Sequence, residues 1–400
     1  MPAANVPSTR SKPPAPVYAI ITDVEREVYP PARSISAKLV AYFRHRAAAS
    51  HGSPEDVAAL PDAGTIEALI DATFWASLRR EEGYAPRISL AFLAPEARRR
   101  PLIFERPLAL RPTELARVAP AVERPGIHLG VWRDPNGLSV WGTTRIVPPL
   151  CFVLEVSAPG LLVVKHSAEE SGKFINVAVL EGDQIKMVDE RASSQPGCPA
   201  LLTSLLGSDS PGGWGHSVNV LVQLAVSMRA HGRGGLLLVV PAGSGTWRES
   251  IVQPIAYAVS PPFAELARLT GEAPSQTDRR VWQDMLGRAV DELGGLTAVD
   301  GAMVLTDRYE LLGFGAKIGR RKGWAQVERL RLTEPVEGGE ALVIHPEELG
   351  GTRHLAAAQF VHDQHDAIAL VASQDTRFTV FEWSACEDMV CAHRIEALLL

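Results

Sequence analysis

The spacing of apolar residues in the first half of the chain predicts helices followed by strands. Apolar side chains recur every three or four positions over residues 34–46 and 65–80, which is the period of one helix face. Residues 87–94 then alternate as a half-buried strand does. Further strand-like runs follow at 126–132, 138–146, 151–156, 161–164 and 176–180. We therefore expect an α+β domain that is rich in β-structure.

The pattern changes after residues 207–215, a stretch dominated by Gly and Ser that predicts a loop. A helix is expected from Ser217 to Gly232, and residues 235–240 are a continuous apolar run, typical of a strand buried on both faces. Thr277 is expected to cap the next helix. The remaining expected strands are 301–305, 310–318, 367–372 and 378–381, with a helix between the middle pair. This order predicts an α/β sandwich.

These patterns divide the chain into two domains with short ends. Residues 1–16 are rich in Pro, which disfavours helices and sheets, and we expect a disordered leader there. The first domain then spans 17–210, the second spans 211–385, and 386–400 form a C-terminal tail whose apolar end docks on the core or on a partner. A chain of 400 residues with 46% hydrophobic content is long enough to bury two such cores.

Charge and composition narrow the classes of function. The net charge of −6 and the isoelectric point near 6.0 argue against a general nucleic-acid binder, which needs a basic surface. The cysteines show no metal-ligand spacing, so free thiols in a reducing compartment are expected; they are Cys151, Cys198, Cys386 and Cys391. The N-terminus does not resemble a signal peptide, and no apolar run is long enough to span a bilayer. We expect a cytoplasmic protein with neither nucleic-acid nor membrane partners.

Asp300-Gly301-Ala302 is the first candidate for chemistry. Asp300 directly precedes an apolar strand and would lie at a strand end, where α/β sheets usually bind ligands. The missing side chain of Gly301 would let a sugar or base approach the backbone. Taken alone, an Asp-Gly pair is most often only a turn.

Gly351-Thr352-Arg353-His354 is the second candidate. A hydroxyl, a guanidinium and an imidazole at the beginning of a helix, with the helix amides behind them, suit a polyphosphate. A capping Thr beside a surface Arg explains the same residues equally well. Ser373-Gln374-Asp375 closes a third apolar strand and adds another acid. Polar clusters at three ends of expected strands or helices are more than we would expect if these residues served only to form turns.

These motifs, together with residues 235–240, resemble in order those of the DisA-type diadenylate cyclase (DAC) domain. The resemblance covers roughly residues 215–385 and implies an α/β fold with a mixed β-sheet flanked by helices. The first half resembles the sensor region called DACNV, on the basis of residues 74–78 and the following Glu81-Glu82-Gly83. The implied arrangement is a DACNV-like sensor domain at 17–210 followed by a DAC-like cyclase domain at 211–385.

The resemblance implies a role for each matching residue. The catalytic residues would be Asp300, Arg353 and His354. A divalent cation, Mg²⁺ or Mn²⁺, would be held by Asp300, His354 and Asp375. The nucleotide, ATP, would contact Gly301, Ala302, Gly315, Ile318, Gly351, Thr352, Arg353 and Ser373. Two subunits would meet face to face as a homo-oligomer, and two ATP molecules would be condensed into cyclic di-AMP with release of pyrophosphate.

The sequence departs from the family pattern in three motifs. Leu355 replaces its second arginine, Gln374-Asp375 replace two glutamates, and Lys317-Ile318-Gly319 replace a Leu-Pro-Leu stretch. The segment 320–349 is longer than usual and is expected to form a hairpin or flap. Two hypotheses stay open: an active cyclase, and a nucleotide-binding sensor that has lost turnover. A nucleic-acid-binding regulator is disfavoured by the acidic balance.

A cluster of His and Asp at 362–366 has the composition of a metal site. It falls where a helix must turn into the next strand, so a polar turn is the favoured interpretation.

Overall fold

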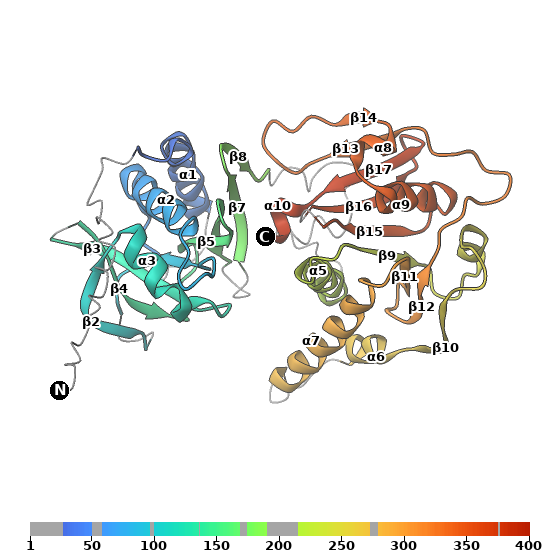
Figure 1. Cartoon of the computed structure of the whole chain (residues 1–400), viewed down its shortest axis with the longest axis horizontal. Helices are drawn as coiled ribbons and strands as arrows, with labels where there is room; N and C mark the ends of the chain where they lie inside the picture. The colour runs from blue at the N-terminus through green and yellow to red at the C-terminus, as the bar shows by residue number, and fades with distance from the viewer. Residues whose placement is uncertain are drawn as a thin grey trace, which may run out of the picture.

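The computed structural model describes residues 27–49, 58–96, 100–135, 137–168, 174–189, 215–272, 279–374 and 377–400. Some sequence predictions fall outside these residues: the leader at 1–16, the loop at 207–215 up to residue 214, the helix cap Thr277 and the metal ligand Asp375. Within the described chain, two mixed β-sheets, each flanked by helices, stand side by side (Figure 1). The expected α/β class, with helices and then strands in the first half, is therefore confirmed.

The N-terminal unit begins with two helices that pack together on its sheet. Its helices are α1 (Pro30–Ala49), α2 (Ala63–Ser77) and α3 (Pro112–Val118). Its strands are β1 (Ser89–Phe92), β2 (Leu102–Ala109), β3 (His128–Asp134), β4 (Gly137–Thr144), β5 (Phe152–Ala158), β6 (Leu161–Ser167), β7 (Phe174–Glu181) and β8 (Gln184–Met187). Over the described residues they form one sheet in the order β2-β4-β3-β1-β5-β6-β7-β8.

Local chemistry explains where these helices begin. Helix α1 starts at Pro30 rather than at residue 34, because proline is tolerated in the first turn, where no helix N–H bond is lost. The apolar spacing still sets its buried face, with Ile35, Leu39 and Phe43 in the core. Asp62 caps α2 by accepting a hydrogen bond of 2.8 Å from the backbone N–H of Thr65.

The C-terminal unit is built on a second mixed sheet. Its strands are β9 (Gly235–Val240), β10 (Tyr257–Phe263), β11 (Ala302–Thr306), β12 (Leu311–Ala316), β13 (Leu330–Thr333), β14 (Leu342–Ile344), β15 (Ile368–Ala372), β16 (Phe378–Ser384) and β17 (Met389–Arg394). Its helices are α5 (Gly215–Ala230), α6 (Glu265–Gly271), α7 (Arg279–Leu296), α8 (Pro346–Leu349), α9 (Thr352–Asp363) and α10 (Glu396–Leu399). Across the part of the chain described, the strand order is β10-β12-β11-β9-β15-β16-β17-β13-β14.

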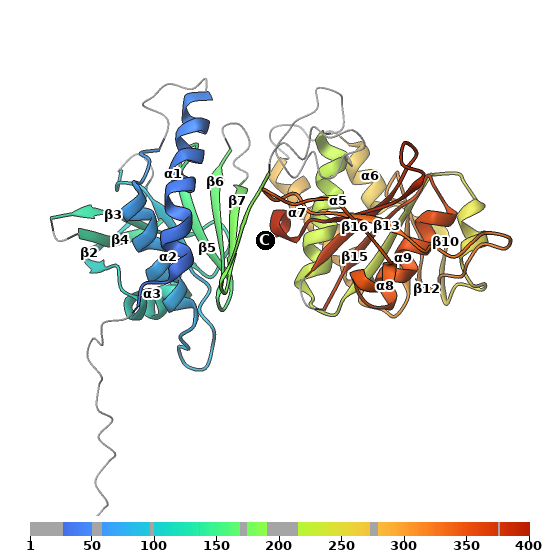
Figure 2. The same cartoon turned by 90° about the horizontal axis from the view of Figure 1, so that it is seen from above.

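The continuous apolar run at β9 is buried on both faces, as its sequence predicts. Leu237 and Val239 join one core with α5 and α7, whereas Leu236 and Leu238 join a second core with α9. Helices therefore cover both faces of the middle of this sheet (Figure 2). This sandwich leaves the ends of the central strands free to form a site.

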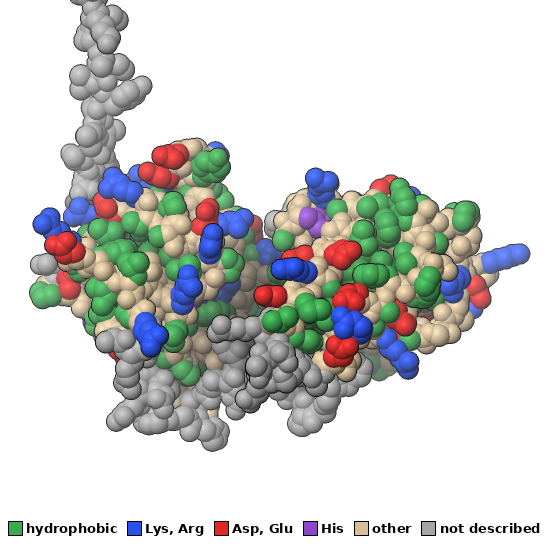
Figure 3. Space-filling model, turned by 90° about the horizontal axis from the view of Figure 1, so that it is seen from below, with side chains coloured by type: hydrophobic (Ala, Val, Ile, Leu, Met, Phe, Trp, Pro, Cys, Tyr) green, Lys and Arg blue, Asp and Glu red, His purple; other side chains and the backbone are tan. Residues whose placement is uncertain are grey.

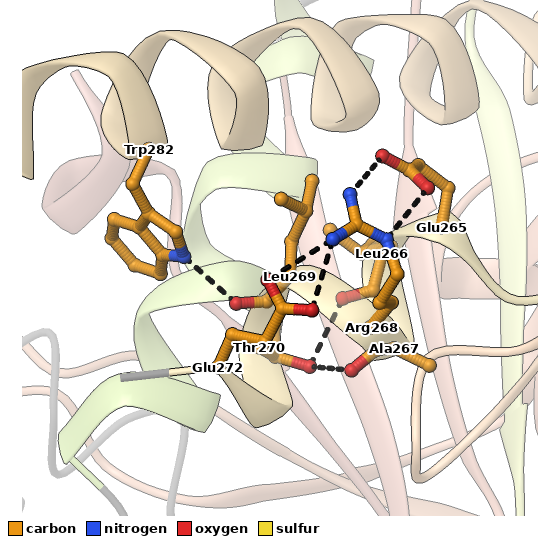
Figure 4. A network of polar contacts seen from close by, with 8 residues as sticks. All are labelled: Glu265, Leu266, Ala267, Arg268, Leu269, Thr270, Glu272 and Trp282. Atoms are coloured by element: carbon orange, nitrogen blue, oxygen red, sulfur yellow. Dashed lines mark hydrogen bonds and ion pairs between the residues drawn. The ribbon is translucent and has the colours of Figure 1, made fainter. Parts of the chain in front are cut away.

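Helix α6 is attached to α7 by a hydrogen bond and carries ion pairs of its own (Figure 4). The indole N–H of Trp282, on α7, donates a hydrogen bond of 2.8 Å to the carbonyl of Leu269. On α6, Arg268 forms ion pairs with Glu265 and Glu272 at 2.7 and 3.0 Å. The contact anchors α6, which lies next to the edge strand β10 along the chain.

The sheet continues past residue 385. Strand β17 pairs with β16 in antiparallel and with β13 in parallel orientation, and β13 in turn pairs with β14. The segment expected as a hairpin or flap at 320–349 therefore supplies two strands at one end of the sheet. Helix α10 follows, and its Ala397 is buried against Leu161, Val163 and Val179 of the N-terminal unit. The apolar chain end thus docks on a core of the same chain.

The two units meet at α10 (Figure 1), and backbone and side-chain contacts join them there. Val188 forms an isolated antiparallel bridge with Val336, and Lys186 forms an ion pair of 2.6 Å with Glu334. The side-chain amide of Asn176 donates a hydrogen bond of 2.8 Å to the carbonyl of Ala397.

The surface carries charges of both signs. On the face shown in Figure 3, Lys and Arg side chains are interspersed with Asp and Glu over both units. Within the described chain, none of the helices is both long enough and apolar enough to cross a membrane.

Candidate functional site

A cavity of about 230 Å³ lies at one edge of the C-terminal sheet. We call it the edge cavity; it is lined by Leu236, Asp300, Gly301, Ala302, Ala316, Lys317, Ile318, Thr352, Arg353 and Ala356. These residues come from the beginnings of β9, β11 and α9 and from the end of β12 and the residues after it. Segments that are far apart in the sequence therefore meet at one place.

The edge cavity lies at the amino ends of β9 and β11. These two strands are parallel, whereas β12 runs antiparallel to β11 and β15 antiparallel to β9. Ligands in α/β sheets usually bind at the carboxyl ends of parallel strands, so this site is at the opposite edge. The site lies at this edge because Asp300 precedes its strand and because α9 begins at the same edge.

The structure brings together most of the residues expected to act in catalysis, metal binding or nucleotide binding, but not all of them. Six of them line the edge cavity: Asp300, Gly301, Ala302, Ile318, Thr352 and Arg353. Four others are described and do not line it: Gly315, Gly351, His354 and Ser373. Asp375, expected as a metal ligand, lies outside the described residues.

Asp300 is paired with a residue to which the sequence had given no role. The ammonium Nζ of Lys317 lies 2.5 Å from Oδ2 of Asp300, and both side chains are exposed to solvent. The hydrogen bond from Lys317, its charge and the charge of Arg353 hold the pKa of Asp300 below its ordinary value. The carboxylate is thus ionised at neutral pH, with two cations beside it.

The pair depends on a close approach of two strands. The backbone of Gly301 has φ +113°, and a Cβ there would lie 2.5 Å from the carbonyl carbon of Gly315. Gly315 has φ +68°, and its own Cβ would lie 2.9 Å from the ring of Tyr257. Both positions therefore require glycine. At Gly301, the missing side chain makes room for the neighbouring strand, in addition to any room for a ligand.

The beginning of α9 supplies the basic group of the edge cavity. Gly351 is the N-cap residue of α9, and Thr352 and Arg353 lie in the first turn of the helix. Nη1 of Arg353 lies 3.0 Å from where a Cβ of Gly234 would be, which places the guanidinium beside the residue before β9. A helix N-terminus carrying an arginine is a favourable environment for an anion.

His354 is separated from the edge cavity although it directly follows Arg353. Its side chain is buried, with 5% of the residue exposed, and its ring packs edge-to-face on Phe381 with centroids 6.2 Å apart. A Cβ on Gly350 would lie 2.5 Å from Nδ1 of His354, so the ring also rests on the backbone there. The expected pairing of His354 with Asp300 on a metal therefore has no support from its position.

The acids of the described residues do not form a complete metal-binding set, since no group of three His, Cys, Asp or Glu side chains gathers there. Asp300 alone suits a Mg²⁺ ion that keeps its waters and takes its other ligands from substrate phosphates. In the cluster at 362–366, Asp363 accepts hydrogen bonds from the side chain of Gln359 and the backbone N–H of Arg321, at 2.7 and 2.6 Å. His365 stacks on Trp383 with centroids 3.7 Å apart.

Comparison with known proteins shows a similarity in part of the N-terminal unit. Residues 55–145 match the family described as "Probable sensor domain DACNV". DACNV is a domain associated with diadenylate cyclases. The match runs from just before α2 to the end of β4, within the region expected to resemble this sensor. No curated protein matches the chain.

Proposed function

We propose that the C-terminal unit binds ATP in the edge cavity and condenses two ATP molecules into cyclic di-AMP, with release of pyrophosphate. The N-terminal unit would act as its sensor. The observation that carries this proposal is the convergence of Asp300, Lys317, Thr352 and Arg353, from three separate segments, on one cavity. The DACNV match at residues 55–145 supports it, because that sensor domain is associated with diadenylate cyclases.

The reaction is a nucleotidyl transfer. The 3′-hydroxyl oxygen of one ATP attacks the α-phosphorus of the other, the new P–O bond forms, and the bond to pyrophosphate breaks as the hydroxyl proton leaves. A second, identical step closes the ring. Catalysis of this kind depends on positioning and on neutralising negative charge, and the protein needs no covalent step of its own.

The residues of the edge cavity fit these tasks. Arg353 offers a planar set of donors to phosphate oxygens, and Thr352 adds a hydroxyl at the positive end of α9. Lys317 exchanges its contact with Asp300 for one with the triphosphate. Asp300, whose pKa is lowered, is a weak base but a good cation ligand, so it would hold Mg²⁺ or Mn²⁺, which supplies positive charge at the phosphates when bound.

Each ring-forming step joins two nucleotides, and the edge cavity of about 230 Å³ is small for two. We therefore propose that two chains place their edge cavities face to face, each loaded with one ATP. ATP as the substrate is consistent with a cytoplasmic protein.

A second function is favoured by specific contacts. The ion pair between Lys317 and Asp300 occupies the carboxylate that a cation would need, and His354 is buried and does not line the edge cavity. Together with Leu355 in place of a second arginine, these contacts favour a unit that binds ATP and signals without turning it over.

Product analysis tests the proposal. The full chain is incubated with ATP and Mn²⁺, and the products are resolved by chromatography and mass spectrometry, with ATP binding measured by calorimetry. We expect cyclic di-AMP from the unmodified chain and from Asp284→Asn, a matched control at an exposed position on α7. Asp300→Asn should bind ATP but form no product. ATP binding without any product would support the sensor function, and absence of both would refute the nucleotide site.

A further inference from the structure

Another cavity, of about 390 Å³, is lined by residues of both units and includes residues of the C-terminal helix α10. Helix α10 lies between the two units (Figure 1). We call this cavity the junction cavity. One wall is formed by β6, β7 and β8 of the N-terminal unit, and the other by α5, β17 and α10 of the C-terminal unit, with the residue before β16. It is separate from the edge cavity, since the two have no lining residue in common.

Basic side chains outnumber acidic ones in this lining. The cations are Lys186, Arg229, Arg377 and Arg394, whereas the carboxylates are Glu181 and Glu396. A polar cavity with an excess of fixed positive charge favours an anionic occupant.

The contacts of these residues leave donors for a ligand. Among the described residues, no hydrogen bond or ion pair is seen for the guanidinium of Arg394, whose charge acts on the nearby carboxyl of Glu396. Lys186 is only partly engaged with Glu396, at 3.9 Å, because its short contact of 2.6 Å is with Glu334.

These groups define the chemistry of the missing partner. Arginine side chains present paired N–H donors that match the oxygens of a phosphate, and several cations together suit a group with more than one negative charge. The carboxylates of Glu181 and Glu396 in the same lining suit a hydrogen-bond donor next to that phosphate, such as a hydroxyl. The volume is in the range of small-molecule sites.

We propose that the junction cavity binds a small phosphorylated molecule that also carries hydroxyl groups, its phosphate held by Arg394 and Arg377 and a hydroxyl donating to Glu396. Both units supply walls of this site, so the ligand contacts the sensor and the C-terminal unit together. Its effect can reach the edge cavity along the chain. Arg229, in the last turn of α5, donates a hydrogen bond of 2.9 Å to the carbonyl of Leu399. The turn that follows α5 leads to Gly234, which lies beside Arg353.

Calorimetric titration of the full chain with ribose 5-phosphate, inorganic phosphate and ribose tests this site. We expect ribose 5-phosphate to bind, phosphate to bind more weakly, and ribose not to bind. Arg394→Gln should weaken ribose 5-phosphate binding by about tenfold or more, the effect of losing one charged hydrogen bond. Arg329→Gln, at an exposed position outside the cavity, is the matched control and should leave binding unchanged.

A variant that is expected to strengthen binding shows that weaker binding in Arg394→Gln does not come from misfolding. Glu181→Gln removes a carboxylate from the lining and should tighten ribose 5-phosphate binding, which a damaged fold would not do. Arg353→Ala separates the two sites, because it alters the edge cavity and should leave this binding intact. No binding of ribose 5-phosphate, binding that Arg394→Gln leaves unchanged, or binding lost in Arg353→Ala would each overturn the proposal. Equal affinity for inorganic phosphate would overturn the hydroxyl contact.

Discussion

Replacing Gly301 by alanine tests how the candidate site is built. In the structure, this glycine has φ +113° and its Cβ position lies 2.5 Å from the carbonyl carbon of Gly315, and 2.8 Å from both its Cα and its oxygen. All three of these atoms belong to backbone, which cannot rotate away as a side chain can. Gly351→Ala is the matched control, because a Cβ at Gly351 meets nothing within 4 Å and φ is −75°.

The expected cost of Gly301→Ala has two parts. A non-glycine residue held in this region of φ costs about 1–3 kcal/mol. Forcing backbone apart to ordinary contact distance resembles overpacking of a core, which costs typically ~1–3 kcal/mol. A loss of roughly 3 kcal/mol or more in the free energy of unfolding follows. Alanine at the N-cap position Gly351 should cost roughly 1 kcal/mol or less.

Urea unfolding followed by circular dichroism measures the difference. With a slope of about 2 kcal/mol per molar, Gly301→Ala should lower the midpoint of the C-terminal unit by about 1.5 M or more. Gly351→Ala should lower it by no more than about 0.5 M. If the two variants unfold at the same midpoint, the close approach of Gly301 to Gly315 is not the reason for glycine there.

Further expectations concern single side chains. Lys317→Met should raise the pKa of Asp300 towards its ordinary value, which NMR titration of the carboxyl carbon measures. Because this pKa is lowered in the folded chain, the ion pair stabilises the fold when Asp300 is ionised, and this stability is lost as the pH falls through the lowered pKa. Trp282→Phe should cost about 1 kcal/mol in thermal unfolding through its lost hydrogen bond to α6. His354→Ala should lower the melting temperature yet leave ATP affinity within about twofold, because the ring is buried outside the edge cavity. Burial lowers the pKa of His128 to about 4, so the N-terminal unit should lose up to about 3 kcal/mol of its free energy of unfolding as the pH falls from 6.5 to 4. Unfolding measured at a series of pH values follows this loss, and His128→Gln should make the stability less dependent on pH.

The sequence predicts the central strands well and the outer ones poorly. Strands β9 and β11 are continuous apolar runs because both faces of the sheet are covered, and such runs are visible in the sequence. Strands β2 and β10 are largely exposed and carry no apolar alternation, and β10 also contains Pro261-Pro262. Backbone pairing, which no side-chain pattern encodes, holds them at the ends of their sheets.

The candidate site shows the same limit at the level of single residues. Asp300 and Arg353 were expected at a ligand because their motifs are short and local. Lys317 was not given a role, because its contact with Asp300 depends on how β11 pairs with β12. The register of that pairing is irregular, so it cannot be read from the sequence of either strand. His354 was expected beside Arg353, but each helix residue turns by about 100°, so it joins the buried face of α9 with Ala357 instead.

Release of pyrophosphate from ATP and from 3′-deoxy-ATP tests the central claim most directly. The proposed reaction uses the 3′-hydroxyl as the attacking group, so the full chain with Mn²⁺ should release pyrophosphate from ATP, two molecules for each cyclic di-AMP formed. It should release none from 3′-deoxy-ATP, although the edge cavity can still bind the triphosphate. Equal release from the two nucleotides, or no release from ATP while ATP binds, would contradict the proposed cyclase reaction.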